Sequence, residues 1–133
     1  MAFNLDELYV DPGRAAQGVW VDCFSGSKLK LAYSEGKAYK ARLAKLYRQN
    51  RLEIDDTNED SWDRIQEVTA RALAECVLLD WEGIVINGEE VKYTVELGTQ
   101  VLQQYPKLRE FVIEKAAEPS TFREGLISKV KKS

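Results

Sequence analysis

The densest group of side chains that could bind a metal or transfer protons is an acidic run in the middle of the chain. It holds five carboxylates: Asp55, Asp56, Glu59, Asp60 and Asp63. Carboxylate oxygens bind calcium and act as general acids or bases. A calcium-binding loop, however, needs carboxylates at alternate positions followed by a glycine and a distal glutamate, and that order is missing. We therefore expect a solvated, helix-capping face, with residues 53–60 as a loop before the next helix.

Other residues with chemical potential lack the partners that catalysis needs. Asp80 and Glu82 flank Trp81, but a carboxylate pair without a histidine, lysine or metal beside it is typical of a surface. The chain contains no histidine, which removes the commonest general base at neutral pH and the commonest zinc ligand. The two cysteines, Cys23 and Cys76, form no C-x-x-C pair. The sequence thus predicts a protein that is not an enzyme and needs no cofactor or metal.

The 133 residues, 44% of them hydrophobic, suit one domain with a real core. The N-terminus has no basic start followed by an apolar run, and no segment is long and apolar enough to cross a membrane. We therefore expect a protein that stays in the cytoplasm where it is made and has no membrane partner.

Charge is divided between two segments of the chain. Residues 28–51 hold eight Lys or Arg against one Glu, a net of +7, whereas residues 53–96 hold thirteen acids against three basic residues, a net of −10. A basic helix with Tyr39 and Tyr47 could meet nucleic acid. Packing of the basic helix near the acidic segment, or against an acidic neighbouring subunit, is favoured, because the remaining surface would repel phosphates. The two opposite charges also suit head-to-tail self-association into a homo-oligomer.

In the first half of the chain, the patterns predict an arm, a β-hairpin and a helix. Residues 1–17 mix acids with isolated apolar side chains and are expected to form a flexible arm. The β-branched and aromatic run 18–24 and the alternating segment 28–33 predict a hairpin with one wet face. After Ser34, which can serve as an N-cap, residues 35–50 have the apolar spacing of an amphipathic helix.

The second half is expected to be mainly helical. Apolar residues recur every three or four positions over 62–79, which predicts a long helix. Asn87-Gly88 indicates a tight turn in a short hairpin or loop near residues 83–93. Three more signals define the remaining helices: Thr94 as an N-cap, Pro106 in a first turn and Pro119 as a breaker. Together these elements predict an α+β fold with about five helices, a single domain over residues 18–128 and a basic C-terminal tail at 129–133.

Four large side chains are candidates for the core of this domain. Trp20, Trp62, Trp81 and Phe122 are more typical of a core than of an interface. Trp81, between two acids and two residues before a glycine, is the weakest of the four candidates.

The stretch 72–122 resembles the tail assembly chaperones of long-tailed, siphovirus-type bacteriophages. Three segments carry this resemblance: Leu78-Leu79-Asp80-Trp81-Glu82-Gly83-Ile84, then Asn87-Gly88-Glu89-Glu90-Val91-Lys92-Tyr93-Thr94, and Leu108-Arg109-Glu110-Phe111-Val112-Ile113-Glu114-Lys115-Ala116-Ala117 with Phe122 beyond it. The earlier strands and the start of the basic helix are compatible with the same family. The resemblance therefore covers most of the chain.

The resemblance implies a role in viral morphogenesis in the cytoplasm of the bacterial host. Such a chaperone binds the tape measure protein, keeps it soluble and helps the tail tube protein to assemble around it, and is not expected in the mature virion. Helix-in-groove contacts could serve this role without a cofactor. We take two sets of residues as candidate protein-interaction surface: Trp81, Ile84 and Tyr93 around the loop, and Lys40, Arg42, Lys45 and Arg48 on the basic helix. Core packing under the loop is an equal alternative for the first set.

Two other functions remain open from the residues. The opposite charges would also suit a structural virion protein, such as a head-tail connector or a tail completion protein. The basic segment would suit a small nucleic-acid-binding regulator, although a nucleic-acid partner is the least favoured of the three.

Overall fold

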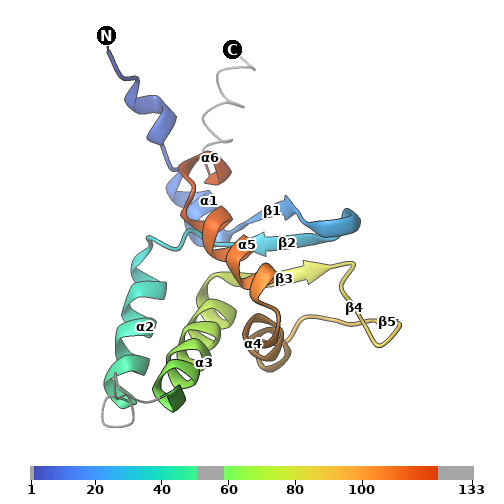
Figure 1. The fold of residues 1–133 in the computed structure, drawn as a ribbon. Helices are drawn as coiled ribbons and strands as arrows, with labels where there is room; N and C mark the ends of the chain where they lie inside the picture. Colours follow the sequence, from blue (N-terminus) through green and yellow to red (C-terminus); the bar gives the residue numbers. More distant parts are fainter. Residues whose placement is uncertain (1, 51–58, 123–133) are drawn as a thin grey trace.

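The computed structural model describes residues 2–50 and 59–122, which form the α+β fold that the sequence predicts (Figure 1). The hairpin at the N-terminal end of the domain and the mainly helical body are both present. In chain order the elements are η1 (Leu5–Leu8), α1 (Pro12–Gln17), β1 (Val19–Asp22), η2 (Phe24–Gly26), β2 (Lys28–Leu31), α2 (Lys37–Gln49), α3 (Glu59–Cys76), β3 (Leu78–Glu82), β4 (Val85–Ile86), β5 (Glu89–Glu90), α4 (Val95–Gln104), α5 (Pro106–Ala117) and α6 (Pro119–Phe122).

The main sheet has three antiparallel strands in the order β1-β2-β3. The predicted hairpin supplies β1 and β2, and β3 pairs with the other edge of β2. The predicted helix over 62–79 is therefore too long, because α3 ends at Cys76 and residues 78–82 form a strand. In β3, Leu78 and Trp81 are buried, and Trp81 lies opposite Leu29 of β2. Cross-strand packing outweighs the helical spacing here.

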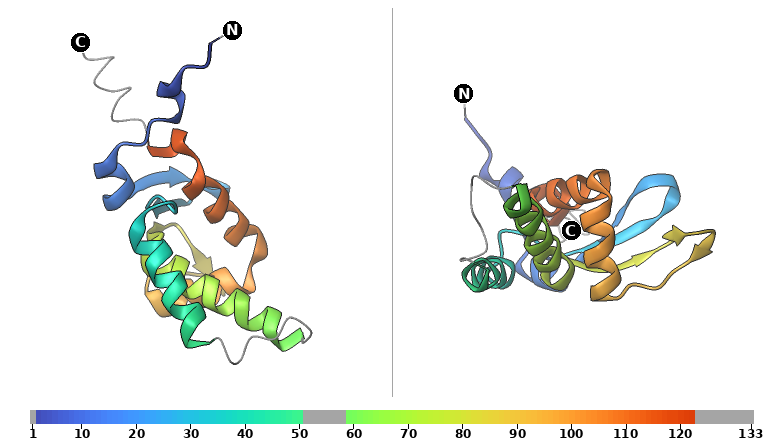
Figure 2. Two further views of the ribbon diagram at one scale, coloured as in Figure 1. Left: turned by 90° about the vertical axis from the view of Figure 1, so that its left-hand side faces the viewer. Right: turned by 60° about the horizontal axis from the view of Figure 1, so that its bottom comes forward.

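The helices form a layer in which α3 lies between α2 and α4 (Figures 1 and 2). The main core joins this layer to the sheet, and its largest fully buried side chains include Leu29, Leu73, Leu78, Leu102 and Val112. A smaller cluster between α2 and α3 buries Leu46, Val68 and Ala72. None of the described helices is long and apolar enough to pass through a bilayer.

Regular structure begins before residue 18, so the prediction that residues 12–17 belong to a flexible arm is wrong. The Asp11 side chain caps α1 by accepting hydrogen bonds from the backbone of Gly13 (2.9 Å) and Arg14 (3.2 Å). The Asp11 N–H donates to the Phe122 carbonyl (3.0 Å), and the Tyr33 N–H donates to the Ala15 carbonyl (2.9 Å). These bonds tie α1 to the body, whereas the segment before it points away from the body (Figure 1).

Of the two predicted N-caps Thr94 and Ser34, only Thr94 caps its helix. Thr94 caps α4 as predicted, by accepting a hydrogen bond from the Leu97 N–H (3.1 Å). Ser34 does not cap α2, which begins after Gly36, because the Ser34 hydroxyl donates instead to the Ala116 carbonyl (3.2 Å). Ser34 thus joins the segment before α2 to the end of α5.

The proline predictions are confirmed. Pro106 opens α5, and the break before Pro119 separates α5 from α6. The acidic loop predicted at 53–60 lies outside the described residues as far as residue 58, and the prediction is wrong for its last two residues, because α3 already begins at Glu59. The basic tail at 129–133 also lies outside the described residues.

Candidate functional site

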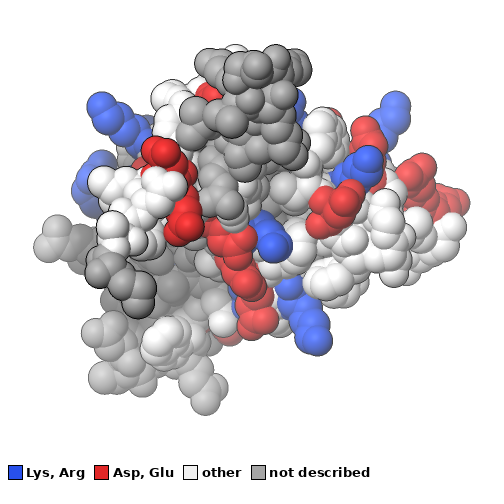
Figure 3. All heavy atoms as spheres, turned by 90° about the horizontal axis from the view of Figure 1, so that it is seen from above, with Lys and Arg blue, Asp and Glu red and all other residues white. Residues whose placement is uncertain are grey.

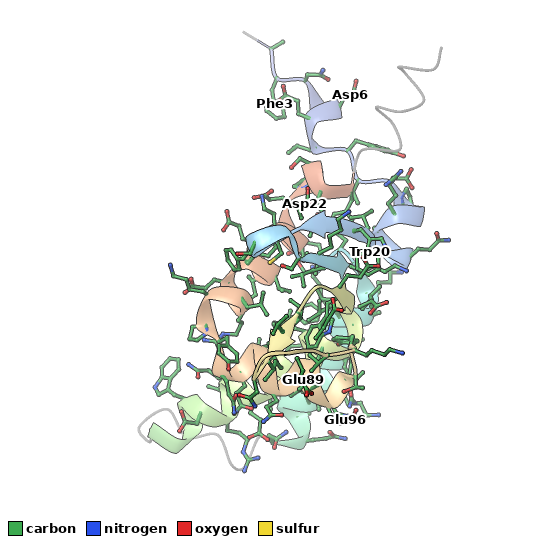
Figure 4. The ribbon with its side chains drawn as sticks, turned by 90° about the vertical axis from the view of Figure 1, so that its right-hand side faces the viewer. Phe3, Asp6, Trp20, Asp22, Glu89 and Glu96 are labelled. Carbon is green, nitrogen blue, oxygen red and sulfur yellow. The ribbon has the colours of Figure 1, made fainter. Side chains whose placement is uncertain are left out.

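A groove of about 430 Å³ opens where three separate parts of the chain meet. One wall is the turn between β1 and β2, the second is the β4-β5 hairpin, and the third is the junction of α4 and α5. These elements lie together on the side of the molecule that Figure 4 turns to the viewer. The lining is mainly apolar and consists of Cys23, Phe24, Ser27, Gly83, Ile84, Val85, Ile86, Asn87, Val101, Tyr105, Lys107 and Leu108.

Large apolar side chains from each wall of this groove reach solvent. Phe24 is 55% exposed, Val85 is 60% exposed and Tyr105 is 53% exposed. The Phe24 ring packs on the Phe111 ring of α5, with the ring centres 5.5 Å apart. An apolar concave surface with exposed aromatic residues at its edge is typical of a protein-interaction site.

The first wall owes its shape to a tight turn between β1 and β2. Ser25 has a φ of 55° and Gly26 a φ of 81°, a left-handed conformation that reverses the chain. Ser27 is buried, and its hydroxyl donates a hydrogen bond of 2.6 Å to the Phe24 carbonyl. The Cys23 N–H donates to the Ser27 carbonyl (2.8 Å). This turn holds Phe24 at the edge of the groove.

The second wall is the small hairpin that Asn87-Gly88 predicted. Asn87 has a φ of 53° and Gly88 a φ of 81°, as expected for a two-residue turn with two left-handed residues. The Val91 N–H donates to the Ile84 carbonyl (2.9 Å), which closes the base of the hairpin. A hairpin of two-residue strands needs further support to keep its shape.

Trp81 supplies part of this support from the main sheet. Its side chain is only 4% exposed, and its indole N–H donates to the Val91 carbonyl (2.8 Å). The Trp81 and Tyr93 rings meet edge to face, with their centres 5.0 Å apart. Trp81 therefore fastens the end of the hairpin to β3.

Tyr93 supplies the rest of the support for the hairpin. Its hydroxyl lies within hydrogen-bond distance of the Ala74 carbonyl and of the Leu78 carbonyl (2.7 Å), and it donates its single proton to them. Burial raises the pKa of the Tyr93 hydroxyl well above its usual value, and the negative charges of Asp80 and Glu96 raise it further. The hydroxyl therefore keeps its proton and remains a hydrogen-bond donor.

The first set of predicted site residues is thus divided. Ile84 lines the groove, and its role in an interaction stays a prediction. Trp81 and Tyr93 instead pack beneath the hairpin, which is the alternative that the sequence left open for them. Trp81 is too deeply buried to be a contact surface, so its role is to position the wall.

The second set lies on α2, on the opposite side of the helical layer from the hairpins (Figure 1). Arg42 donates from Nε and Nη2 to the Glu75 carboxylate of α3, with 3.2 Å between Nη2 and Oε1. Lys40 pairs with Glu35 at 2.6 Å, whereas Lys45 and Arg48 are exposed. The structure does not bring this set together with the groove. Arg42 instead joins the basic helix to the acidic part of the chain, the packing that the charge pattern favoured.

The Glu75 carboxylate gives this contact a dependence on pH. Hydrogen bonds from Arg42, the largest cause, and from Arg71 (2.8 Å) lower the pKa of Glu75 against the opposing effect of burial. Because the folded-state pKa lies below the unfolded one, the stabilisation is complete above the ordinary glutamate pKa. It is lost as the pH falls through the folded-state value.

We therefore expect Glu75→Gln to lower stability at neutral pH and to flatten the acid side of the stability profile. Urea denaturation of both proteins between neutral pH and the most acidic pH at which they fold would measure this. Glu67→Gln is the matched control, because Glu67 is half exposed and pairs with Arg64 at 3.6 Å. Parallel stability profiles for wild type and Glu75→Gln would contradict the assignment.

The exposed edge of the groove was not predicted from the sequence. It consists of Phe24, Val85 and Tyr105. Phe24 and Tyr105 each stand next to a structural signal, the Ser25-Gly26 turn and the Pro106 helix start. Connecting segments usually run over the protein surface, so a large apolar side chain at such a junction can stay exposed. That signal could have placed these residues at the surface, but not in one groove.

The groove supplies apolar and aromatic contact area with Lys107 as the charged residue of its lining. Within the parts of the chain that the structure describes, no three or more Cys, Asp or Glu side chains gather to hold a metal ion. The arrangement can bind the apolar side chains of a partner.

Comparison with known proteins gives the class of this chain. The sequence model of a family described as YdaY prophage protein matches residues 34–132, which is most of the chain. The protein therefore belongs to the YdaY prophage protein family and is phage-derived. No curated protein and no solved structure matches it.

Proposed function

We propose that this protein is a bacteriophage tail assembly chaperone that binds the tape measure protein, keeps it soluble and assists assembly of the tail tube. The observation that carries the proposal is the groove edged by Phe24, Val85 and Tyr105 in a phage-derived protein. A long helical client exposes apolar side chains before the tube surrounds it, and a groove of this kind can cover them.

The construction of the groove supports this role. Its walls come from three segments, and Trp81 and Tyr93 fix the hairpin through hydrogen bonds to backbone carbonyls. A surface formed before binding has less conformational entropy to lose when the client docks. The groove can therefore remain open in water and accept apolar segments of differing sequence.

Co-expression with the tape measure protein of the same phage genome tests the proposal. We expect the chain to increase the soluble fraction of the tape measure protein and to co-purify with it. The double variant Val85→Ser/Tyr105→Ser should reduce both, because it removes exposed apolar area and leaves the buried core in place.

The matched control is Trp62→Ser, which removes a side chain that is 62% exposed on α3. This control should retain the client. Unchanged solubility of the tape measure protein and no co-purification with the wild-type chain would reject the proposal.

The same proposal expects the protein to act in the host cytoplasm and to leave before the virion is complete. Mass spectrometry of purified particles distinguishes it from a connector or tail completion protein. Many copies in mature virions would favour that structural role instead.

A further inference from the structure

Acidic side chains stand along the hairpin wall of the groove. Glu89 and Glu90 of β5 are exposed and lie directly opposite Ile86 and Val85, which line the groove. Residues that face each other across an antiparallel pair project to the same side of it. Each of these two groove residues therefore has a carboxylate as its nearest cross-strand neighbour. Because successive strand residues point to opposite faces, the two carboxylates lie on opposite faces of the hairpin.

More carboxylates lie where the main sheet meets the groove. Asp22 directly precedes Cys23, and Glu82 directly precedes Gly83. Lys28 lies opposite both Asp22 and Glu82 in the sheet, so both carboxylates have the same lysine as a cross-strand neighbour.

The balance of charge around the groove is therefore negative. Four carboxylates adjoin the lining residues, against three cations: Lys28, the lining residue Lys107, and Arg109, which directly follows Leu108. Figure 3 shows red and blue atoms side by side at the end of the molecule where the two hairpins lie, and further red atoms over the middle and the other side.

We infer that the groove selects a partner segment in which apolar anchor residues are flanked by Lys or Arg. The apolar lining provides contact area for the anchors, and the carboxylates attract the flanking cations while repelling acidic segments. This inference rests on the proposed function, since it defines which segments of the client the groove accepts.

Two fluorescein-labelled helical peptides test this selection on the full-length chain. Both carry leucine at i, i+3, i+4 and i+7; one has lysine at the flanking positions and the other has glutamate. Fluorescence anisotropy should show roughly tenfold tighter binding of the lysine peptide at low salt, because several exposed charge pairs change from attraction to repulsion. Raising the ionic strength should bring the two affinities together.

The double variant Glu89→Gln/Glu90→Gln should reduce the preference for the lysine peptide and leave the circular dichroism spectrum unchanged. Asp6→Asn/Glu7→Gln is the matched control, since it removes the same charge from η1. Figure 4 shows Asp6 at the top of the molecule and Glu89 in its lower half, well apart from each other. The control should keep the full preference.

Equal affinity for both peptides, tighter binding of the glutamate peptide, or no binding of either would overturn the inference. These outcomes are distinct from failure of the proposed function, which is judged by co-purification of the tape measure protein. A chain that solubilises its client and binds both peptides equally is a chaperone without this charge selection.

Discussion

Replacing Trp81 with alanine is expected to lower the free energy of unfolding by about 3–5 kcal/mol, the usual loss for a large aromatic residue removed from a core. Trp81 is 4% exposed and lies opposite Leu29 in the sheet. The variant also loses the hydrogen bond to the Val91 carbonyl and the edge-to-face contact with Tyr93. Urea or guanidinium denaturation at neutral pH measures the change.

Trp62→Ala is the control for this prediction, because it makes the same substitution at a side chain that is 62% exposed. Surface substitutions of this kind usually change stability by about 0.5 kcal/mol or less. Losses of equal size for the two variants would show that the burial of Trp81 does not support the fold as described.

Gly98→Ala is expected to destabilise the protein by about 2–3 kcal/mol, as overpacking of a core does. In an ordinary helix the same change stabilises by roughly 0.5–1 kcal/mol. Here a Cβ at residue 98 would lie 2.6 Å from Cε1 and 2.8 Å from the hydroxyl oxygen of Tyr93. Tyr93 must then move, and its hydroxyl loses its place beside the Ala74 and Leu78 carbonyls. Thermal or chemical denaturation reads out the difference.

Measuring the stability change of Gly98→Ala in a Tyr93→Ala protein as well separates this clash from any effect of the helix itself. In a Tyr93→Ala protein the obstructing ring is absent, so Gly98→Ala should become neutral or stabilising. The two substitutions would then show a large interaction energy in a double-mutant cycle. If Gly98→Ala costs the same in both backgrounds, the close approach of Tyr93 to α4 is not its cause.

Features set by local chemistry could be predicted from the sequence. Asn87-Gly88 specifies a turn through its backbone conformation, Thr94 caps through its own side chain, and Pro106 fits a first helical turn. The β1-β2 hairpin follows from alternation over a few residues. Each of these signals lies within the element that it defines.

The two tryptophans at 62 and 81 show where local patterns fail. Helical spacing placed Trp62 among the apolar residues of its helix, yet it is exposed. Trp81 is buried although Asp80 and Glu82 flank it, because adjacent residues of a strand point to opposite faces. The acidic neighbours therefore say nothing about burial once residues 78–82 are a strand.

The groove could not be predicted because its walls are distant in sequence. Phe24, Val85 and Tyr105 come together only when β3 joins the sheet and α4 packs against α3. Because the strand at 78–82 was not predicted, no sequence pattern placed the β4-β5 hairpin beside the β1-β2 turn. Ile84 was the one predicted site residue that the fold brings into the groove.

Hydrogen-deuterium exchange of the chain, alone and in complex with the tape measure protein, shows whether the groove holds the client. We expect slower exchange in the complex at residues 83–87 and at 105–108 beside the α4-α5 junction, with little change along α2. Protection confined to α2, or a complex in which the groove exchanges as in the free chain, would contradict it.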